Sequence, residues 1–200
     1  GGARTRGVLA INDDKKPRMD VGVRRAISMA IDRKAGIAGA GDCFGVPIGS
    51  HYVPGAAGYI DTTGVNPYDI EKAKALLKEA GYPNGFESTI WSAYNHTTAQ
   101  KVIQFLQQQL GQVGIKVQVQ ALEAGQRVEK VESAQDPATA PVRMYYVGWS
   151  SSTGEADWAL SPLFASQNWP PTLFNTAFYS NPQVDKDLAD ALKTTKPEEK

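Results

Sequence analysis

The chain is poor in the residues that most often form catalytic or metal sites. It contains one cysteine, Cys43, and two histidines, His51 and His96, among 200 residues. One cysteine excludes an internal disulfide, and because no basic residue stands beside Cys43 we expect an inert thiol. The histidines lie far apart and form no helical i,i+4 pair, so the sequence predicts no zinc site. We therefore expect neither a metal nor a cofactor.

The chain also lacks an excess of charge of one sign and lacks long apolar runs. Its 21 basic and 21 acidic residues cancel, and no block of like charge is present. Nucleic-acid binding requires a basic patch, so we expect no nucleic-acid partner. No apolar run approaches the length that spans a bilayer. The start of the chain does not match a signal peptide, and the run Val8 to Ile11 is too short to predict an independent first element.

Motifs of nucleotide binding and of hydrolysis are absent as well. No GxGxxG follows a predicted strand and no Walker loop exists. The run from Gly148 to Ser152 lacks the closing glycine of a nucleophile elbow. The sequence thus does not predict an enzyme. A serine hydrolase that uses Ser150 to Ser152 with His51 or His96 remains a less favoured alternative.

Helical and strand patterns alternate along the chain. Asp20, Asp69 and Asn181 are expected to cap helices, the last with Pro182 in its first turn and Val184, Leu188 and Leu192 inward. A further helix is expected near 97–113, a short one near 128–131, and strands over 86–91, 115–121 and 142–147. Residues 42–68, rich in glycine and proline, predict a long irregular segment. This order predicts an α/β domain with a partly parallel sheet.

The stretch from Val147 to Phe174 is the strongest candidate for a binding site. It holds three of the four tryptophans next to hydroxyl residues that follow a predicted strand, a position typical of ligand loops. We assign Trp158 to packing and expect Trp149 and Trp169 to face a ligand. The proposed hydrogen-bonding residues are Ser150, Ser151, Ser152 and Thr153. The carboxylates in the same stretch that could bind an amine, or lie solvated, are Glu155 and Asp157.

Two other loops contain candidate ligand contacts. Asn95 and His96 precede a predicted helix, whose free amides attract anions; alternatively, Asn95 or Thr97 only caps that helix. Arg127 could form a bidentate contact with a carboxylate, although an ordinary surface arginine is the competing interpretation.

Several segments resemble one known family. The runs 23–33, 68–86, 113–117 and 179–185 are similar to motifs of the peptide/nickel class of bacterial extracellular solute-binding proteins. The resemblance implies a type II periplasmic binding protein fold, with a mixed sheet flanked by helices, and a monomer that delivers its ligand to an ABC permease in the membrane. It also implies that residues 1–200 form the C-terminal-side lobe of such a receptor, without the first lobe and the last helix and strands.

The loop segments narrow the expected ligand. Residues 95–102, 124–127 and 148–181 resemble the glutathione-binding receptors of this family. The resemblance implies glutathione or a related γ-glutamyl or short peptide; other peptides, opine-like compounds and metal chelates remain alternatives. In peptide receptors of the family an aspartate that binds the ligand amine stands where this chain has Ser152. That departure disfavours ordinary dipeptides and implies a ligand whose amine and α-carboxylate lie together.

Overall fold

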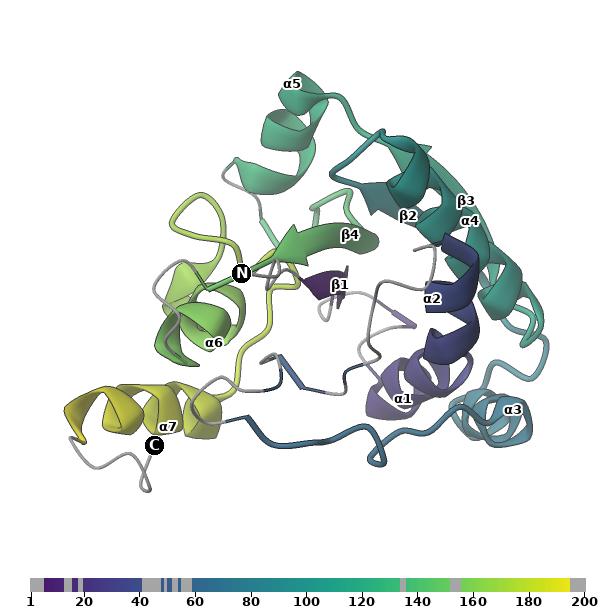
Figure 1. Cartoon of the computed structure of the whole chain (residues 1–200), viewed down its shortest axis with the longest axis horizontal. Coiled ribbons are helices and arrows are strands. Elements are labelled where there is room, and N and C mark those ends of the chain that lie inside the picture. Colours follow the sequence, from purple (N-terminus) through teal and green to yellow (C-terminus); the bar gives the residue numbers. More distant parts are fainter. Residues whose placement is uncertain are drawn as a thin grey trace.

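The protein is an α/β structure in which helices flank a single sheet. This computed structural model describes residues 6–12, 16–17, 20–40, 48, 50–51, 54, 59–133, 136–151 and 156–194. The predicted α/β class with a mixed sheet is confirmed (Figure 1). The elements in chain order are β1 (Arg6–Ile11), α1 (Val21–Met29), α2 (Arg33–Ala40), α3 (Ile70–Glu79), β2 (Glu87–Ser92), α4 (Thr97–Gly111), β3 (Lys116–Ala121), α5 (Ala124–Arg127), η1 (Val128–Glu132), β4 (Met144–Trp149), α6 (Ala156–Phe164), η2 (Ser166–Asn168) and α7 (Pro182–Lys193).

The sheet has the strand order β1-β4-β2-β3. Strands β4, β2 and β3 run parallel, and β1 is antiparallel to β4 along its whole length. The expectation that the run Val8 to Ile11 is too short for an element is wrong, because β4 provides a partner for all six residues of β1. Asn12 extends this pairing: its backbone N–H donates to the Arg143 carbonyl and its side chain to the Val142 carbonyl.

Each face of the sheet carries its own apolar cluster. Ile90 and Met144 point to the face that α1, α3 and α4 cover, and both are fully buried there. Tyr145 and Val131 belong to a second cluster on the other face, which includes η1 and part of the segment after α6. Because side chains alternate along a strand, adjacent residues of β4 contribute to different clusters. Figure 1 shows α1 to α4 on one side of the sheet and α6 and α7 on the other side of the molecule.

The predicted helix starts at Asp20, Asp69 and Asn181 are confirmed. Each side chain accepts a hydrogen bond from a backbone N–H of the first helical turn. These bonds satisfy donors that have no partner inside the helix.

The turn that precedes β2 is packed against the turn that precedes β3. Gly85 has a φ of +72°, and a Cβ at this position would lie 2.1 Å from the carbonyl oxygen of Gly114. A side chain cannot fit there, so these two glycines allow neighbouring parallel strands to start side by side.

Helices α2 and α6 were not predicted from the sequence. In α2, Gly36 lies so close to Phe105 of α4 that a Cβ would stand 2.8 Å from the ring. The glycines that weaken the local helical signal therefore permit close packing, and tertiary contact outweighs propensity. In α6, Pro162 lies inside the helix and obscured the pattern.

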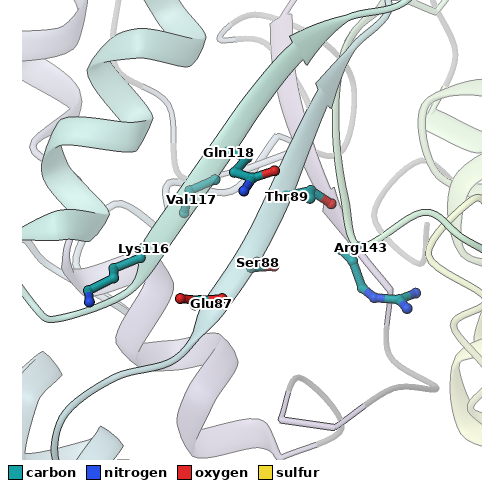
Figure 2. Close-up of a pocket in the computed structure, with 7 residues that line it drawn as sticks. All are labelled: Glu87, Ser88, Thr89, Lys116, Val117, Gln118 and Arg143. Carbon is teal, nitrogen blue, oxygen red and sulfur yellow. The ribbon is translucent and has the colours of Figure 1, made fainter.

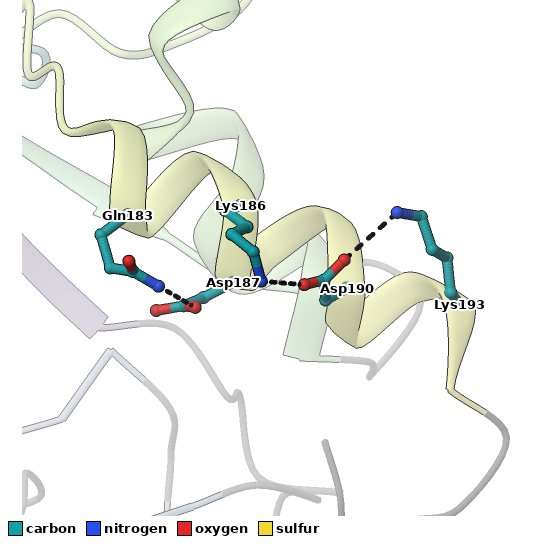
Figure 3. A network of polar contacts seen from close by, with 5 residues as sticks. All are labelled: Gln183, Lys186, Asp187, Asp190 and Lys193. Atoms are coloured by element: carbon teal, nitrogen blue, oxygen red, sulfur yellow. Dashed lines mark hydrogen bonds and ion pairs between the residues drawn. The ribbon is translucent and has the colours of Figure 1, made fainter.

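Helix α7 contains no buried residue, and polar contacts link its own side chains along its exposed surface (Figure 3). Asp190 accepts from Lys186 at 2.6 Å and from Lys193 at 3.2 Å, and Gln183 donates to Asp187. Hydrogen bonding to Lys186 lowers the pKa of the Asp190 carboxyl. The prediction that Leu192 points inward is wrong: its side chain is 62% exposed, since α7 packs chiefly against α6.

Candidate functional site

The candidate site lies where the three parallel strands end. β2, β3 and β4 are parallel neighbours, so the loops that follow Ser92, Ala121 and Trp149 meet at one edge of the sheet. After β3 the chain crosses to the far side of β2, with α4 packed on one face and η1 on the other. Such a reversal of strand order opens a crevice at the carboxyl ends of the strands, where α/β proteins bind ligands.

Hydrogen bonds connect these loops to one another. The Tyr94 hydroxyl, after β2, accepts a hydrogen bond of 3.2 Å from the backbone N–H of Gly148 in β4. The Asn95 amide donates to the Glu123 carboxylate, after β3, at 3.5 Å. The structure thus brings the predicted loops of Asn95, Arg127 and Trp149 to the same edge. Tyr94 was missed in the sequence, although it stands in the loop that was singled out.

The amino end of α4 opens onto this edge. Its cap is His96, whose Nδ1 accepts the Ala99 N–H at 3.2 Å. The expectation that Asn95 or Thr97 is the cap is therefore wrong. The His96 ring lies 5.5 Å from the Tyr94 ring, and Asn95 remains exposed beside it. α4 is 15 residues long, so its first amides present a partial positive charge to the crevice.

The two tryptophans that were expected to face a ligand have different surroundings. Trp149 donates its indole N–H to the Trp158 carbonyl at 3.1 Å, and its ring lies 5.3 Å from that of Phe174. Phe174 is 40% exposed, so this pair offers an aromatic surface to solvent. Phe174 was not singled out in the sequence, since nothing in its neighbourhood marks it as exposed.

Trp169 is tied more firmly into the protein. Its indole N–H donates to the Tyr179 carbonyl at 3.0 Å, and its ring meets Phe178 edge-on at 5.8 Å. The ring packs against the apolar cluster that contains Tyr145. Trp169 thus packs against the protein at this edge, and the residue remains partly exposed to solvent.

The hydroxyl-rich loop is described only in part. Ser150 is exposed and Ser151 half-buried directly after β4. The other predicted contacts in this loop, Ser152, Thr153 and Glu155, lie outside the described residues. Asp157 stands in the first turn of α6 and accepts a hydrogen bond from the Ser161 hydroxyl.

Arg127 forms an ion pair within its own segment. Its Nε lies 3.0 Å from the Glu132 carboxylate, although the N–H does not point along a hydrogen-bond direction. The hydroxyl of Tyr145 is buried, and within the described part of the chain it has no hydrogen-bond partner. Burial raises the pKa of Tyr145, and the charge of Glu132 raises it further against an opposing effect of Arg127.

The loops at this edge carry several kinds of polar and aromatic group. The first amides of α4, the hydroxyls of Ser150 and Ser151, the Arg127 guanidinium and the Trp149–Phe174 pair all belong to them, which makes this edge the candidate for recognition of a small polar ligand. Over the described ranges, no three His, Cys, Asp or Glu side chains gather in a way that could hold a metal ion. Nor do those ranges contain a helix of the length and apolarity that a membrane crossing requires.

A hollow of about 490 Å³ lies at the other end of the strands (Figure 2). It is lined by the first residues of β2 and β3 and by Arg143 before β4. In Figure 2 the charged ends of Lys116 and Arg143 point away from each other and not toward a common centre. The carboxyl edge therefore remains the better candidate, because there the polar groups of three loops are linked.

Known proteins of similar sequence belong to one family. Residues 3–171 match the family described as bacterial extracellular solute-binding proteins, family 5, middle part. The chain is 57% identical over 192 residues to the glutathione-binding protein GsiB of Escherichia coli K12, a match that covers 96% of this chain. It spans 37% of the length of that relative.

Solved structures with the same fold point to the same family. The periplasmic binding protein DppA of Helicobacter pylori, in complex with the peptide STSA, matches with a TM-score of 0.85 and 28% identity over 98% of this chain and 37% of its own. AgaA of A. tumefaciens R10, in complex with agropinic acid, matches with a TM-score of 0.81 and 28% identity over 99% of this chain and 41% of its own. The family match over most of its length establishes that the chain belongs to the bacterial extracellular solute-binding proteins of family 5.

Proposed function

We propose that this chain is one lobe of a periplasmic receptor that delivers glutathione, or a related γ-glutamyl peptide, to an ABC permease. The observation that carries the proposal is the 57% identity to a glutathione-binding protein, which extends over 96% of the chain and so includes all three loops at the carboxyl edge. Loops vary more than the scaffold that carries them, so similarity there bears on the ligand as well as on the fold.

In this proposal residues 1–200 form the C-terminal-side lobe of a monomeric receptor. The first lobe and the last helix and strands belong to the remainder of a longer protein, in keeping with the 37% of the relative that the chain spans. The ligand lies between the lobes and favours the closed form, which the permease recognises. This is a population shift, and its size is set by how much better the closed form binds the ligand.

We propose the following ligand contacts at this edge. Trp149 with Phe174 forms an aromatic wall, and Trp169 contributes the open part of its ring. Asn95 and the amides at the start of α4 donate to a carboxylate, as does Arg127. The hydroxyl loop, Ser150 to Thr153, accepts from and donates to the ligand's polar groups, and Glu155 or Asp157 binds the amine.

In this proposal, Ser152 determines which ligands of the family bind well. A carboxylate at this position would pair with the free amine of a dipeptide, whereas a hydroxyl can only hydrogen-bond to it. The γ-glutamyl group of glutathione holds its amine beside its own α-carboxylate, so its recognition does not depend on a full opposing charge. Ordinary dipeptides therefore bind less tightly in this proposal.

A panel of ligands tests the proposal on a full-length receptor that contains this chain. Binding raises thermal stability by mass action, by about 2.7 kcal/mol when the ligand is at one hundred times its Kd. We expect the largest shift with glutathione, and smaller shifts with alanyl dipeptides, opines and metal chelates. A larger shift with a dipeptide or a chelate would reassign the ligand, and no shift with any of them would overturn the receptor function.

The alternative of a ligand like that of AgaA, which was solved with agropinic acid, is decided by the same panel.

The hydrolase alternative requires a histidine free to act as a base. His96 already uses Nδ1 to cap α4, which disfavours that role. We infer a protein that is not an enzyme, so glutathione should be recovered intact after prolonged incubation with the receptor.

A further inference from the structure

The segment that carries Arg127 contains a turn of unusual geometry. α5 ends at Arg127 and passes directly into the π-helical turn η1, in which the Ser133 N–H donates to the Val128 carbonyl five residues back. In a regular α-helix the neighbouring side chains are three or four residues apart. The wider π turn instead brings together residues five apart, here Arg127 and Glu132.

This pairing leaves most of the guanidinium available. The Nε of Arg127 is buried and lies 3.0 Å from Glu132. Its two terminal nitrogens make no hydrogen bond within the described part of the chain, and they are not buried. The side chain is thus held on one edge while its outer fork, the pair that binds a carboxylate with two parallel hydrogen bonds, faces solvent.

The start of the segment that carries Arg127 is fixed by contacts of its own. Glu123 and Gln126 form a reciprocal capping box at the start of α5, and Glu123 also contacts Asn95 of the neighbouring loop. The Tyr145 hydroxyl, in a residue only 2% exposed, is buried without a hydrogen-bond partner among the described residues. An unsatisfied polar group in such a place is rare in stable structures.

We infer that Glu132 is a positioning residue: it holds Arg127 through Nε so that the guanidinium fork is already oriented toward a carboxylate of the ligand. The inference rests on the proposed function, because it assigns a role to the same site. Its physical basis is pre-organisation, since a long side chain that is already oriented loses less entropy when the ligand binds.

The first experiment measures ligand affinity in a full-length receptor. Glu132→Ala should weaken glutathione binding about three- to tenfold, the cost of ordering one flexible side chain at the binding step. Glu132→Gln should weaken binding less than Glu132→Ala, because an amide of the same shape still lies against the Nε edge of the guanidinium although it carries no charge. Glu129→Ala, which removes an exposed acid from the same turn, serves as the matched control and should leave affinity unchanged.

A double-mutant cycle between Glu132 and Arg127 distinguishes a positioning role of Glu132 from a merely structural one. In an Arg127→Lys background the loss caused by Glu132→Ala should vanish, because no fork remains to be oriented. The loss should also vanish for one of the two glutathione monoamides, the one that lacks the carboxylate bound by Arg127. An equal loss in the lysine background, or with both monoamides, would overturn the inference.

A second experiment needs no ligand. In the 200-residue chain, the Nε–H signal of Arg127 should be resolved and slow to exchange by NMR, and Glu132→Ala should abolish this protection. Exposed Arg25 provides the reference for an unrestrained guanidinium. If Arg127 exchanges as fast as Arg25, the inference is overturned. If wild-type receptor does not bind glutathione, the proposed ligand fails, and the NMR result alone decides whether Glu132 holds Arg127.

Discussion

Two adjacent tyrosines of β4 show how one strand connects two environments. Tyr145 packs into the cluster beneath the carboxyl edge, and Tyr146 packs against the cluster under α1, α3 and α4. Burial raises the pKa of both phenols, with the charge of Glu132 as a further cause at Tyr145. High pH should therefore lower the stability of the fold through β4, the strand that leads to the candidate site.

Tyr145→Phe should alter the pH dependence of stability. The phenol's ordinary pKa is 10.0 and the folded value is higher, so above about pH 10 the unfolded chain loses a proton that the folded protein keeps. Stability is then complete below pH 10 and falls as pH rises, by about 1.4 kcal/mol per unit for each such group. Urea unfolding between pH 8 and 11 should show a shallower decline for Tyr145→Phe.

At neutral pH this variant should be as stable as the wild type or slightly more so, because it removes a buried hydroxyl that has no hydrogen-bond partner among the described residues. Tyr68→Phe, at a side chain that is 46% exposed, is the control and should follow the wild-type curve. Parallel curves for wild type and Tyr145→Phe would contradict the prediction.

Among the described glycines, Gly85 leaves the least room for a side chain. Gly85→Ala forces a Cβ against the Gly114 carbonyl and into a left-handed conformation, and should lower the free energy of unfolding by about 2–4 kcal/mol. Gly111→Ala is the matched control, because no atom lies within 4 Å of a Cβ there. This helical substitution should raise stability by about 0.5–1 kcal/mol. Similar urea midpoints for the two variants would refute the argument.

At the scale of elements, local chemistry predicted some helices and missed others. The caps at Asp20, Asp69 and Asn181 could be read from the sequence because each acts on its own first turn. α2 could not, since its glycines are explained only by contact with Phe105 of a distant helix. The strand predicted to end at Val147 in fact continues to Trp149, because β1 extends its pairing.

For the candidate site, the sequence predicted the strands that lead to the loops but not the contacts of the side chains in them. The predicted strands over 86–91 and 115–121 are confirmed as β2 and β3, and the predicted parallel pairing brings the loops that follow them to one edge. What each side chain does there was not accessible from the sequence. The partner of Arg127 depends on a π turn, and the cap of α4 on a histidine that competes with its two neighbours.

The segment between α6 and α7 depends on one buried asparagine. Asn175 is fully buried; its amide donates to the carbonyls of Ala165 and Tyr179, and its oxygen accepts the Tyr179 N–H. Asn175→Ala removes these bonds and should cost about 2–4 kcal/mol, because backbone groups are left buried without partners. Trp169 lies in this segment, so its fluorescence should shift toward that of an exposed indole.

Thr172→Ala provides the control for this prediction, as an exposed change in the same segment. It should alter stability by less than about 0.5 kcal/mol. Equal unfolding midpoints for Asn175→Ala and Thr172→Ala would show that the asparagine does not hold the segment.

At the scale of the whole molecule, the proposed function makes this chain one side of a binding crevice. The chain spans 37% of the length of the relative GsiB. Under the proposed function, the missing contacts belong to the other lobe. Affinity therefore depends on closure, which only the longer protein can achieve.

The 200-residue chain alone should bind glutathione weakly. Calorimetry should detect no binding at micromolar concentrations of the isolated chain, and clear binding by a full-length receptor under the same conditions. Micromolar affinity of the isolated chain would show that one lobe suffices, and would remove closure from the mechanism.

The pairing of β1 with β4 has a consequence for how the chain reaches its fold. β1 precedes the other strands of the described sheet, and its partner runs from Met144 to Trp149, so that the hydrogen bond from Asn12 to Val142 beside this pairing joins residues 130 positions apart. At about 5–20 residues per second, the ribosome needs on the order of ten seconds to supply that partner. Closing so long a loop is entropically costly, and contacts between distant residues form slowly. During biogenesis, the last pairing of the sheet therefore joins its earliest strand to one of its latest, and β1 stays open to other strands until then.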